Sequence, residues 1–200
     1  MAAQQKAPDA AAWAPPAGWT VWTDAKDSSK SAADTKFVTM GAGFHVTSGP
    51  AAIYYNSSHT ATGMFTVKAT FGQRTRPAMG HSEAYGVFVG GSNLRDNAKQ
   101  SYLYLVVRDD GMFYVAHRAG ANVHKVSDWS ANDAVKKAAE NGSATNEVAI
   151  QVAADSVHMM VNGQKVKSIA KTAGFITDGQ YGLRVNHGLN VHIGNFGMQQ

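Results

Sequence analysis

The chain lacks cysteine and carries little charge. None of its 200 residues is cysteine, which excludes disulfide bonds, thiolate metal sites and a cysteine nucleophile. Charged residues make up 16% of the sequence, and the net charge is +4. The basic residues are scattered and form no stripe with aromatic residues between them, so we predict no nucleic-acid partner. No segment approaches the ~20 apolar residues of a membrane span, so we also predict no membrane span.

Sequence motifs for catalysis and cofactor binding are missing as well. The sequence contains no Gly-x-Ser-x-Gly nucleophile elbow. Its glycine-rich turns do not follow the order of strand, loop and helix that a phosphate-binding loop needs. The eight histidines have neither helical i, i+4 spacing nor a carboxylate in a recognised ligand pattern. We therefore predict no metal site and no cofactor.

The first 18 residues differ in composition from the rest of the chain. They are rich in alanine and proline and show no apolar periodicity. We predict that residues 1–18 are a flexible lead-in and that residues 19–200 form a single domain. The composition of this lead-in resembles the mature N-terminus of an exported bacterial protein, so we expect a periplasmic or extracellular location.

From Trp19 onward the dominant pattern is an alternation of apolar and polar side chains. MFTVKATF (64–71), YGVFV (85–89) and NEVAIQV (146–152) have the period of two that is typical of strands half covered by a core. The segment 130–142, SANDAVKKAAENG, instead begins with an N-capping serine and continues with good helix formers, which predicts a short surface helix over residues 130–139. About a dozen strands and a single helix predict an all-β fold of two antiparallel sheets packed face to face.

Turn residues determine the predicted pairing of neighbouring strands. Asp110-Gly111 and Asn162-Gly163 favour two-residue type I′ turns. In the last predicted hairpin, a three-residue loop over residues 187–189 places the apolar residues of both strands on one face. This register makes Arg184 and His192 cross-strand neighbours on the other face.

Several of these segments together resemble a known superfamily. VHMMVNGQKV (157–166), with ATNEVAIQVAADS before it and DGQYGLRVNHGLNVHIGNFGM after it, resembles the closing half of concanavalin A-like jelly rolls, in particular laminin G-like modules and bacterial keto-disaccharide hydrolase-like domains. AYGVFVGG and SYLYLVVRDDGMFYVAHRAG are similar to the middle strands of such domains. The resemblance implies a jelly-roll sandwich with one concave sheet, which many relatives use to bind or cleave glycans. It brings no catalytic site, because the Glu-x-Asp-x-x-Glu strand of the laminarinase-type relatives is absent here.

The segment 101–118 carries the candidate ligand-binding residues. If its leucines face the core, a two-residue Asp110-Gly111 turn brings tyrosine, arginine and histidine side chains onto the concave sheet. Tyrosine offers a flat apolar body to a sugar ring and a hydroxyl group to its polar edge, and arginine and histidine supply donors. The same tyrosines would also suit ordinary packing beneath a covering loop, and the sequence does not decide between the two. The candidate ligand-binding residues are Tyr102, Tyr104, Arg108 and His117, with Arg184 and His192 as outlying candidates.

A second candidate site is the pair His81 and Glu83 in GHSEAYG. Residues two apart on a strand point in the same direction, so these two side chains form the best candidate for a catalytic acid/base unit. Whether the protein is an enzyme stays open.

Three functions are compatible with the sequence. The first is a carbohydrate-associated module that binds a glycan or a sugar-like small molecule on its concave sheet. The second is a hydrolase or lyase that acts on a modified sugar. The third is a protein-interaction module of laminin G-like type, which would be favoured if Trp13 or Trp22 filled the concave face.

Overall fold

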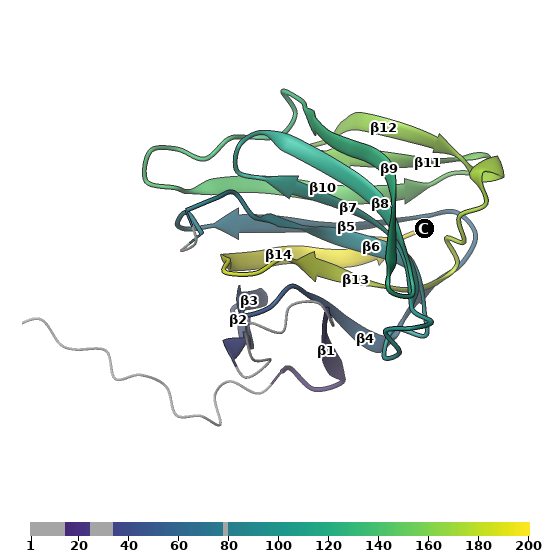
Figure 1. The fold of residues 1–200 in the computed structure, drawn as a ribbon, viewed down its shortest axis with the longest axis horizontal. Helices are drawn as coiled ribbons and strands as arrows, with labels where there is room; N and C mark the ends of the chain where they lie inside the picture. Colours follow the sequence, from purple (N-terminus) through teal and green to yellow (C-terminus); the bar gives the residue numbers. More distant parts are fainter. Residues whose placement is uncertain (1–14, 25–33, 78–79) are drawn as a thin grey trace, which may run out of the picture.

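A computed structural model describes residues 15–24, 34–77 and 80–200. In these residues fourteen strands form two antiparallel seven-stranded sheets that pack face to face (Figure 1). Sheet A has the strand order β1-β4-β13-β6-β7-β8-β9, and sheet B has the order β12-β11-β10-β5-β14-β3-β2. The all-β sandwich predicted from the sequence is confirmed. The strands are β1 (Trp19–Thr23), β2 (Lys36–Met40), β3 (Gly43–Thr47), β4 (Ala52–Ala61), β5 (Phe65–Gln73), β6 (Ala84–Ser92), β7 (Ser101–Arg108), β8 (Met112–Ala119), β9 (Asn122–Ala131), β10 (Ala144–Val152), β11 (Ser156–Val161), β12 (Gln164–Ala170), β13 (Gly179–Val185) and β14 (Asn190–Gln199), and the 3₁₀ helix η3 (Lys171–Ala173) follows β12.

The main core lies between the two sheets and takes every second residue of each strand. In β5 of sheet B, Val67, Ala69 and Phe71 are completely buried, whereas the residues between them are partly exposed. In β7 of sheet A, Leu103 and Leu105 belong to the same core cluster. Because successive side chains of a strand point to opposite faces, the period of two in the sequence produces these two layers directly.

A flexible lead-in is predicted over residues 1–18. Residues 1–14 of it, Trp13 among them, lie outside the described residues. The first described strand, β1, begins at Trp19. In the part of the chain that the structure describes, no helix is long and apolar enough to cross a membrane.

The surface helix predicted over residues 130–139 does not form. β9 extends into this segment, and the chain then runs on in turns and irregular structure. Ala134 and Val135 are buried in the core between the sheets. The side chain of Asn146 accepts a hydrogen bond from the backbone N–H of Lys136 and donates one to the backbone carbonyl group of Lys136. Tertiary contacts therefore override the helix propensity of this segment.

The turn between β11 and β12 agrees with the prediction. Asn162 and Gly163 both have positive φ, 49° and 77°, as a type I′ turn requires. Val161 pairs with Gln164 across the turn.

The turn between β7 and β8 differs from the prediction by one residue. Val107 pairs with Phe113, and the loop between the strands holds three residues, 109–111. Asp109 is kept in the loop because its carboxylate accepts a hydrogen bond from Gln73 Nε2 and its carbonyl group accepts one from the backbone N–H of Ala138.

This shift reverses the two faces of β8, because successive residues of a strand face opposite sides. Arg118, not His117, is the cross-strand neighbour of Tyr102. His117 pairs with Leu103 and therefore points away from the outer face of sheet A. The predicted placement of His117 beside Tyr102 and Tyr104 is wrong.

The last predicted hairpin is wrong as well, because its two strands belong to different sheets. β13 lies between β4 and β6 in sheet A, whereas β14 lies between β5 and β3 in sheet B. His192 pairs with His45 of β3 and is not a neighbour of Arg184. The segment 186–189 crosses from one sheet to the other, and its backbone N–H groups at Gly188 and Leu189 bond to Ser48.

Candidate functional site

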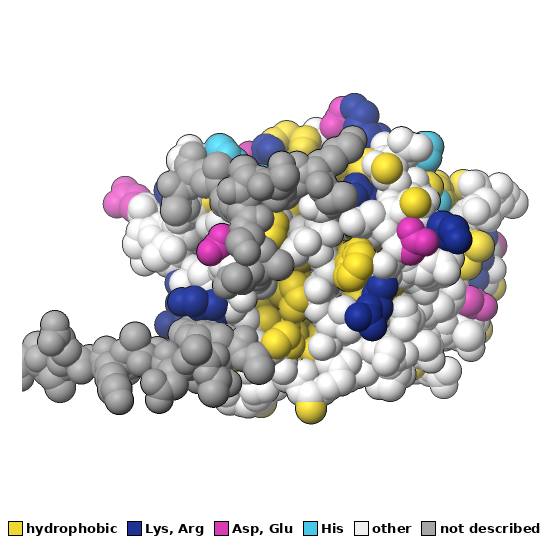
Figure 2. All heavy atoms as spheres, turned by 60° about the horizontal axis from the view of Figure 1, so that its bottom comes forward, with side chains coloured by type: hydrophobic (Ala, Val, Ile, Leu, Met, Phe, Trp, Pro, Cys, Tyr) yellow, Lys and Arg dark blue, Asp and Glu magenta, His cyan; other side chains and the backbone are white. Residues whose placement is uncertain are grey.

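The outer face of sheet A, which points away from sheet B, carries an aromatic and apolar cluster separate from the main core. This outer face is buried at its centre, which is unusual for a sheet face open to water. When the side of the molecule that carries β1 is turned forward, Figure 2 shows hydrophobic side chains gathered near its middle, with lysine and arginine side chains beside them. The outer-face cluster comprises Ile53, Tyr55, Ala84, Phe88, Leu94, Tyr102, Tyr104, Val106 and Ala116, and Trp22, Tyr114 and Trp129 pack against it.

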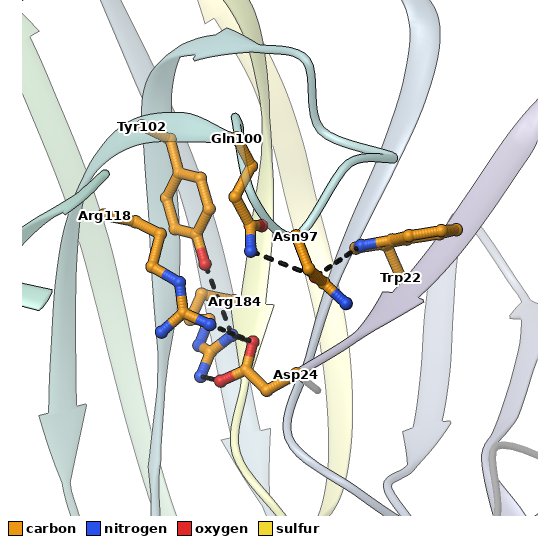
Figure 3. A network of polar contacts seen from close by, with 7 residues as sticks. All are labelled: Trp22, Asp24, Asn97, Gln100, Tyr102, Arg118 and Arg184. Carbon is orange, nitrogen blue, oxygen red and sulfur yellow. Dashed lines mark hydrogen bonds and ion pairs between the residues drawn. The ribbon is translucent and has the colours of Figure 1, made fainter. Parts of the chain in front are cut away.

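A buried ion-pair network lies on this face. Asp24, directly after β1, accepts hydrogen bonds from both terminal nitrogens of Arg184, with distances of 2.9 Å to Oδ1 and 2.7 Å to Oδ2. Arg118 of β8 approaches the same carboxylate, with 3.5 Å between its Nη2 and Oδ1. Figure 3 shows the two guanidinium groups converging on Asp24 beneath Tyr102. Residues from the two ends of the chain and from its middle thus meet at one point.

The network holds more positive than negative charge. Arg118 and Arg184 are each 7% exposed, and among the described residues Asp24 is the one carboxylate paired with them. Burial by itself would raise the pKa of Asp24, but the two guanidinium groups outweigh it and hold the pKa below its ordinary value. Nε of Arg118 and Nε of Arg184 have no hydrogen-bond partner among the described residues. Both Nε donors are buried on this face.

A second group of hydrogen bonds holds the loop after β6. Asn97 Oδ1 accepts hydrogen bonds from Trp22 Nε1 at 2.9 Å and from Gln100 Nε2 at 3.1 Å, as Figure 3 also shows. The backbone N–H of Gln100 bonds to the carbonyl group of Asp96 at 2.7 Å. The loop is thus fixed against β1, and Trp22 packs on the outer-face cluster.

A pocket of about 430 Å³ opens beside this loop. This volume lies within the ~300–1,000 Å³ that small-molecule sites occupy. Tyr55 and Leu94 give it an apolar part, and the remaining lining residues are polar or charged. The pocket is lined by Thr20, Tyr55, Ser57, Asn93, Leu94, Arg95, Asp96 and Gln180.

The structure places four of the six predicted ligand-binding residues on the outer face. Tyr102 is only 1% exposed, and Tyr104 and Arg184 are also buried, so these three build the floor of the face. Burial raises the pKa of both tyrosines, which keeps them neutral donors. Arg108 lies at the edge, with its guanidinium carbon 4.2 Å from the centre of the Trp129 ring. His117 and His192 do not belong to this face.

Sequence reasoning missed several residues of this face. The alternation in AAIYYNSSHT already puts Tyr55 on the face opposite Tyr54, and the correct β7–β8 register would have identified Arg118. No local signal identifies Asp24, because its partner Arg184 lies 160 positions away in the sequence.

The predicted pair of His81 and Glu83 does meet. His81 Nδ1 lies 3.0 Å from Glu83 Oε1, and a third side chain joins them, with His187 Nε2 2.8 Å from the same oxygen. Glu83 is 5% exposed, whereas both histidines are more open. His187 was not predicted, because it follows β13, a strand whose pairing with β6 is a tertiary feature.

Comparison with solved structures defines the class of fold. The chain has the fold of the concanavalin A-like jelly-roll sandwiches. It is similar to the carbohydrate-binding module CBM66 from Bacillus subtilis, with a TM-score of 0.66 and 10% identity over 92% of this chain and 96% of that chain. It is also similar to a protein of unknown function with a galectin-like fold from Bacillus subtilis, with a TM-score of 0.64 and 12% identity over 91% and 89% of the two chains.

A third similar structure is a family 16 glycoside hydrolase from Bacteroides ovatus in complex with a mixed-linkage glucan product. Its TM-score is 0.58, with 8% identity over 88% of this chain and 92% of that chain. No family model matches the sequence, and a search among curated proteins finds no related sequence. At these identities the similarity establishes the fold.

Proposed function

We propose that this chain is a glycan-binding module and that the sugar binds in the pocket beside the loop after β6. The observation that carries the proposal is the pocket itself, in which Tyr55 and Leu94 lie among polar side chains on an outer sheet face with a buried aromatic floor. A sugar ring presents an apolar C–H face and a rim of hydroxyl groups, so it needs this combination of apolar surface with donors and acceptors.

The chemistry of the pocket supports this assignment in more detail. Arg95 supplies several donors, Asp96 supplies an acceptor, and the amides of Asn93 and Gln180 supply both. The structural similarity to a carbohydrate-binding module and to a glycoside hydrolase adds support from outside the chain. An exported location, in the periplasm or outside the cell, is part of the proposal because such glycans are met there.

The test is a glycan array with the purified chain, followed by calorimetric titration of each hit against Arg95→Ala. We expect the variant to raise the dissociation constant about tenfold or more, since a hydrogen bond from a charged donor contributes about 1.5–3 kcal/mol. Arg74→Ala is the matched control, because Arg74 is an exposed arginine that follows β5 in sheet B. Equal affinity of Arg95→Ala and the wild type would remove the pocket from the proposal, and an array without hits would overturn the proposal.

A second candidate function is cleavage of a modified sugar, either by hydrolysis or by a lyase reaction. It is favoured by the contact between His81 and the buried carboxylate of Glu83, which would provide an acid/base unit. Mass spectrometry of every array hit after incubation with the protein separates the two functions. New products would identify an enzyme, and recovery of the intact glycan would identify a binding module.

A further inference from the structure

Three side chains with metal-ligating atoms meet at one end of the sandwich, outside the proposed glycan pocket. The atoms of His81, Glu83 and His187 that could bind a metal all lie within 4.8 Å of one another. His81 and Glu83 directly precede β6, and His187 follows β13. Because β6 and β13 pair in sheet A, the start of one strand and the end of the other lie side by side.

The backbone around these residues is held firmly. The N–H of Asn186 bonds to the carbonyl group of Ala84 at 2.8 Å, which joins the two strand ends. On the far side of His187, the N–H of Gly188 bonds to the carbonyl group of Ser48 at 3.1 Å. Ser48 Oγ also donates a hydrogen bond to the carbonyl group of Asn186. His187 is thus fixed on both sides in the sequence, as a ligand on a preorganised site should be.

The distances within the cluster suit a small cation. The two histidine nitrogens lie 3.0 Å and 2.8 Å from Glu83 Oε1. Ligands of a tetrahedral Zn²⁺, bound at about 2.0–2.2 Å, lie about 3.3 Å from one another. Each contact with Glu83 would lengthen by a few tenths of an ångström on binding, and the two histidine nitrogens, which lie within 4.8 Å of each other, would approach by up to about 1.5 Å.

A second buried carboxylate lies close by. Asp109 is 4% exposed, and its Oδ1 has no hydrogen-bond partner among the described residues. Asp109 and His81 line the same small pocket, which has a volume of about 90 Å³. This volume has room for a water molecule as a further ligand, and Asp109 offers that water a hydrogen-bond acceptor.

We propose that His81, Glu83 and His187 bind a divalent transition-metal ion, with Zn²⁺ as the expected occupant. Two imidazoles with one carboxylate favour such ions over Mg²⁺ and Ca²⁺, which prefer sites built from oxygen alone. The pairs His45 with His192 and His117 with His124 also lie across neighbouring strands, but neither forms a three-ligand group with a carboxylate among the described residues. The assignment does not depend on the glycan proposal.

The test is calorimetric titration of the chelator-treated full chain with ZnCl₂, with MgCl₂ and CaCl₂ as comparisons. We expect one equivalent of Zn²⁺ to bind, and the affinity to fall at least tenfold in His187→Asn, which alters a partly exposed side chain and spares the buried Glu83. His124→Asn is the matched control and should bind Zn²⁺ like the wild type. A second readout is the thermal unfolding midpoint, which Zn²⁺ should raise in the wild type and in His124→Asn but not in His187→Asn.

Several results would overturn the metal site. They are an absence of Zn²⁺ binding to the wild type, equal affinity in the wild type and His187→Asn, and a loss of affinity in His124→Asn instead. Circular dichroism of each variant verifies that its fold is intact. If His187→Asn does not fold, His81→Asn replaces it, because the His81 side chain is 53% exposed.

Discussion

At the scale of single residues, the position of Asp24 is the most consequential feature of the outer face. Its carboxylate is the common partner of Arg184 and Arg118, which come from β13 and β8. Removing one member of a buried ion-pair group leaves uncompensated charge in a poorly solvated place. Asp24 therefore compensates the positive charge of two arginines that would otherwise be buried without a counter-ion.

Replacing Asp24 by asparagine should lower the free energy of unfolding at neutral pH by about 3–5 kcal/mol. Because the pKa of Asp24 is held below 3.8 in the folded state, its stabilising effect is present above that pH and is lost as the pH falls through the folded pKa. The free energies of unfolding of wild type and variant, measured with urea between pH 2 and 7, should therefore converge only at the acidic end of this range. A constant difference over the whole range would contradict this role.

Asp110→Asn provides the comparison for a more exposed ion pair. The Asp110 side chain is 36% exposed and pairs with Arg108. We expect its removal to change the free energy of unfolding by about 1 kcal/mol or less.

At the scale of the elements, the segment between β9 and β10 shows how one polar side chain shapes a loop. Asn146 of β10 is completely buried. Its Oδ1 accepts hydrogen bonds from the N–H of Lys136 and from Asn162 Nδ2, and its Nδ2 donates to Tyr85 Oη and to the carbonyl group of Lys136. The loop is held to both sheets by these bonds, which explains why a sequence of good helix formers adopts irregular structure.

Asn146→Ala should lower the free energy of unfolding by about 2–4 kcal/mol, because it leaves several buried donors and acceptors without partners. The loop should also become more open to exchange, which hydrogen–deuterium exchange at residues 132–142 would detect. Asn122→Ala is the matched control, since Asn122 is an exposed residue at the start of β9. Equal stability of the two variants would contradict the assigned role of Asn146.

At the scale of the whole molecule, the two sheets share one core and should unfold together. The core between them includes residues of both sheets, among them Leu105 of β7 and Ile150 of β10. Neither sheet can bury its inner face without the other, which is the physical origin of cooperative unfolding. The three described tryptophans, Trp19, Trp22 and Trp129, lie in sheet A. Trp19 also packs against Phe37 and Phe44 of sheet B, so tryptophan fluorescence reports on sheet A and on its contact with sheet B.

Leu105→Ala should therefore lower the free energy of unfolding by about 2–5 kcal/mol, because it leaves a cavity in this core. Tryptophan fluorescence from sheet A and far-ultraviolet circular dichroism from both sheets should give the same unfolding midpoint in the wild type and in the variant. Met64→Ala, at a side chain that is 63% exposed, should change the stability by about 0.5 kcal/mol or less. Separate midpoints for the two probes would show that the sheets unfold independently.

The sequence by itself determined the kind of strand and the class of fold. The period of two in segments such as 64–71 and 146–152 is a local property, since each side chain's face follows from its position in the strand. The positive φ at Asn162-Gly163 is equally local and was predicted correctly. The resemblance of segments such as 157–166 to concanavalin A-like sandwiches implied the same class of fold.

The tertiary structure decided which sheet each strand joins and which side chains meet. β13 and β14 are neighbours in the sequence but lie in different sheets, and a one-residue change in the β7–β8 loop exchanged His117 for Arg118 on the outer face. Asp24 and His187 acquire their roles only through contacts with distant residues. The physical reason is that register and sheet membership depend on the combined packing of all strands, and no single segment of sequence contains that information.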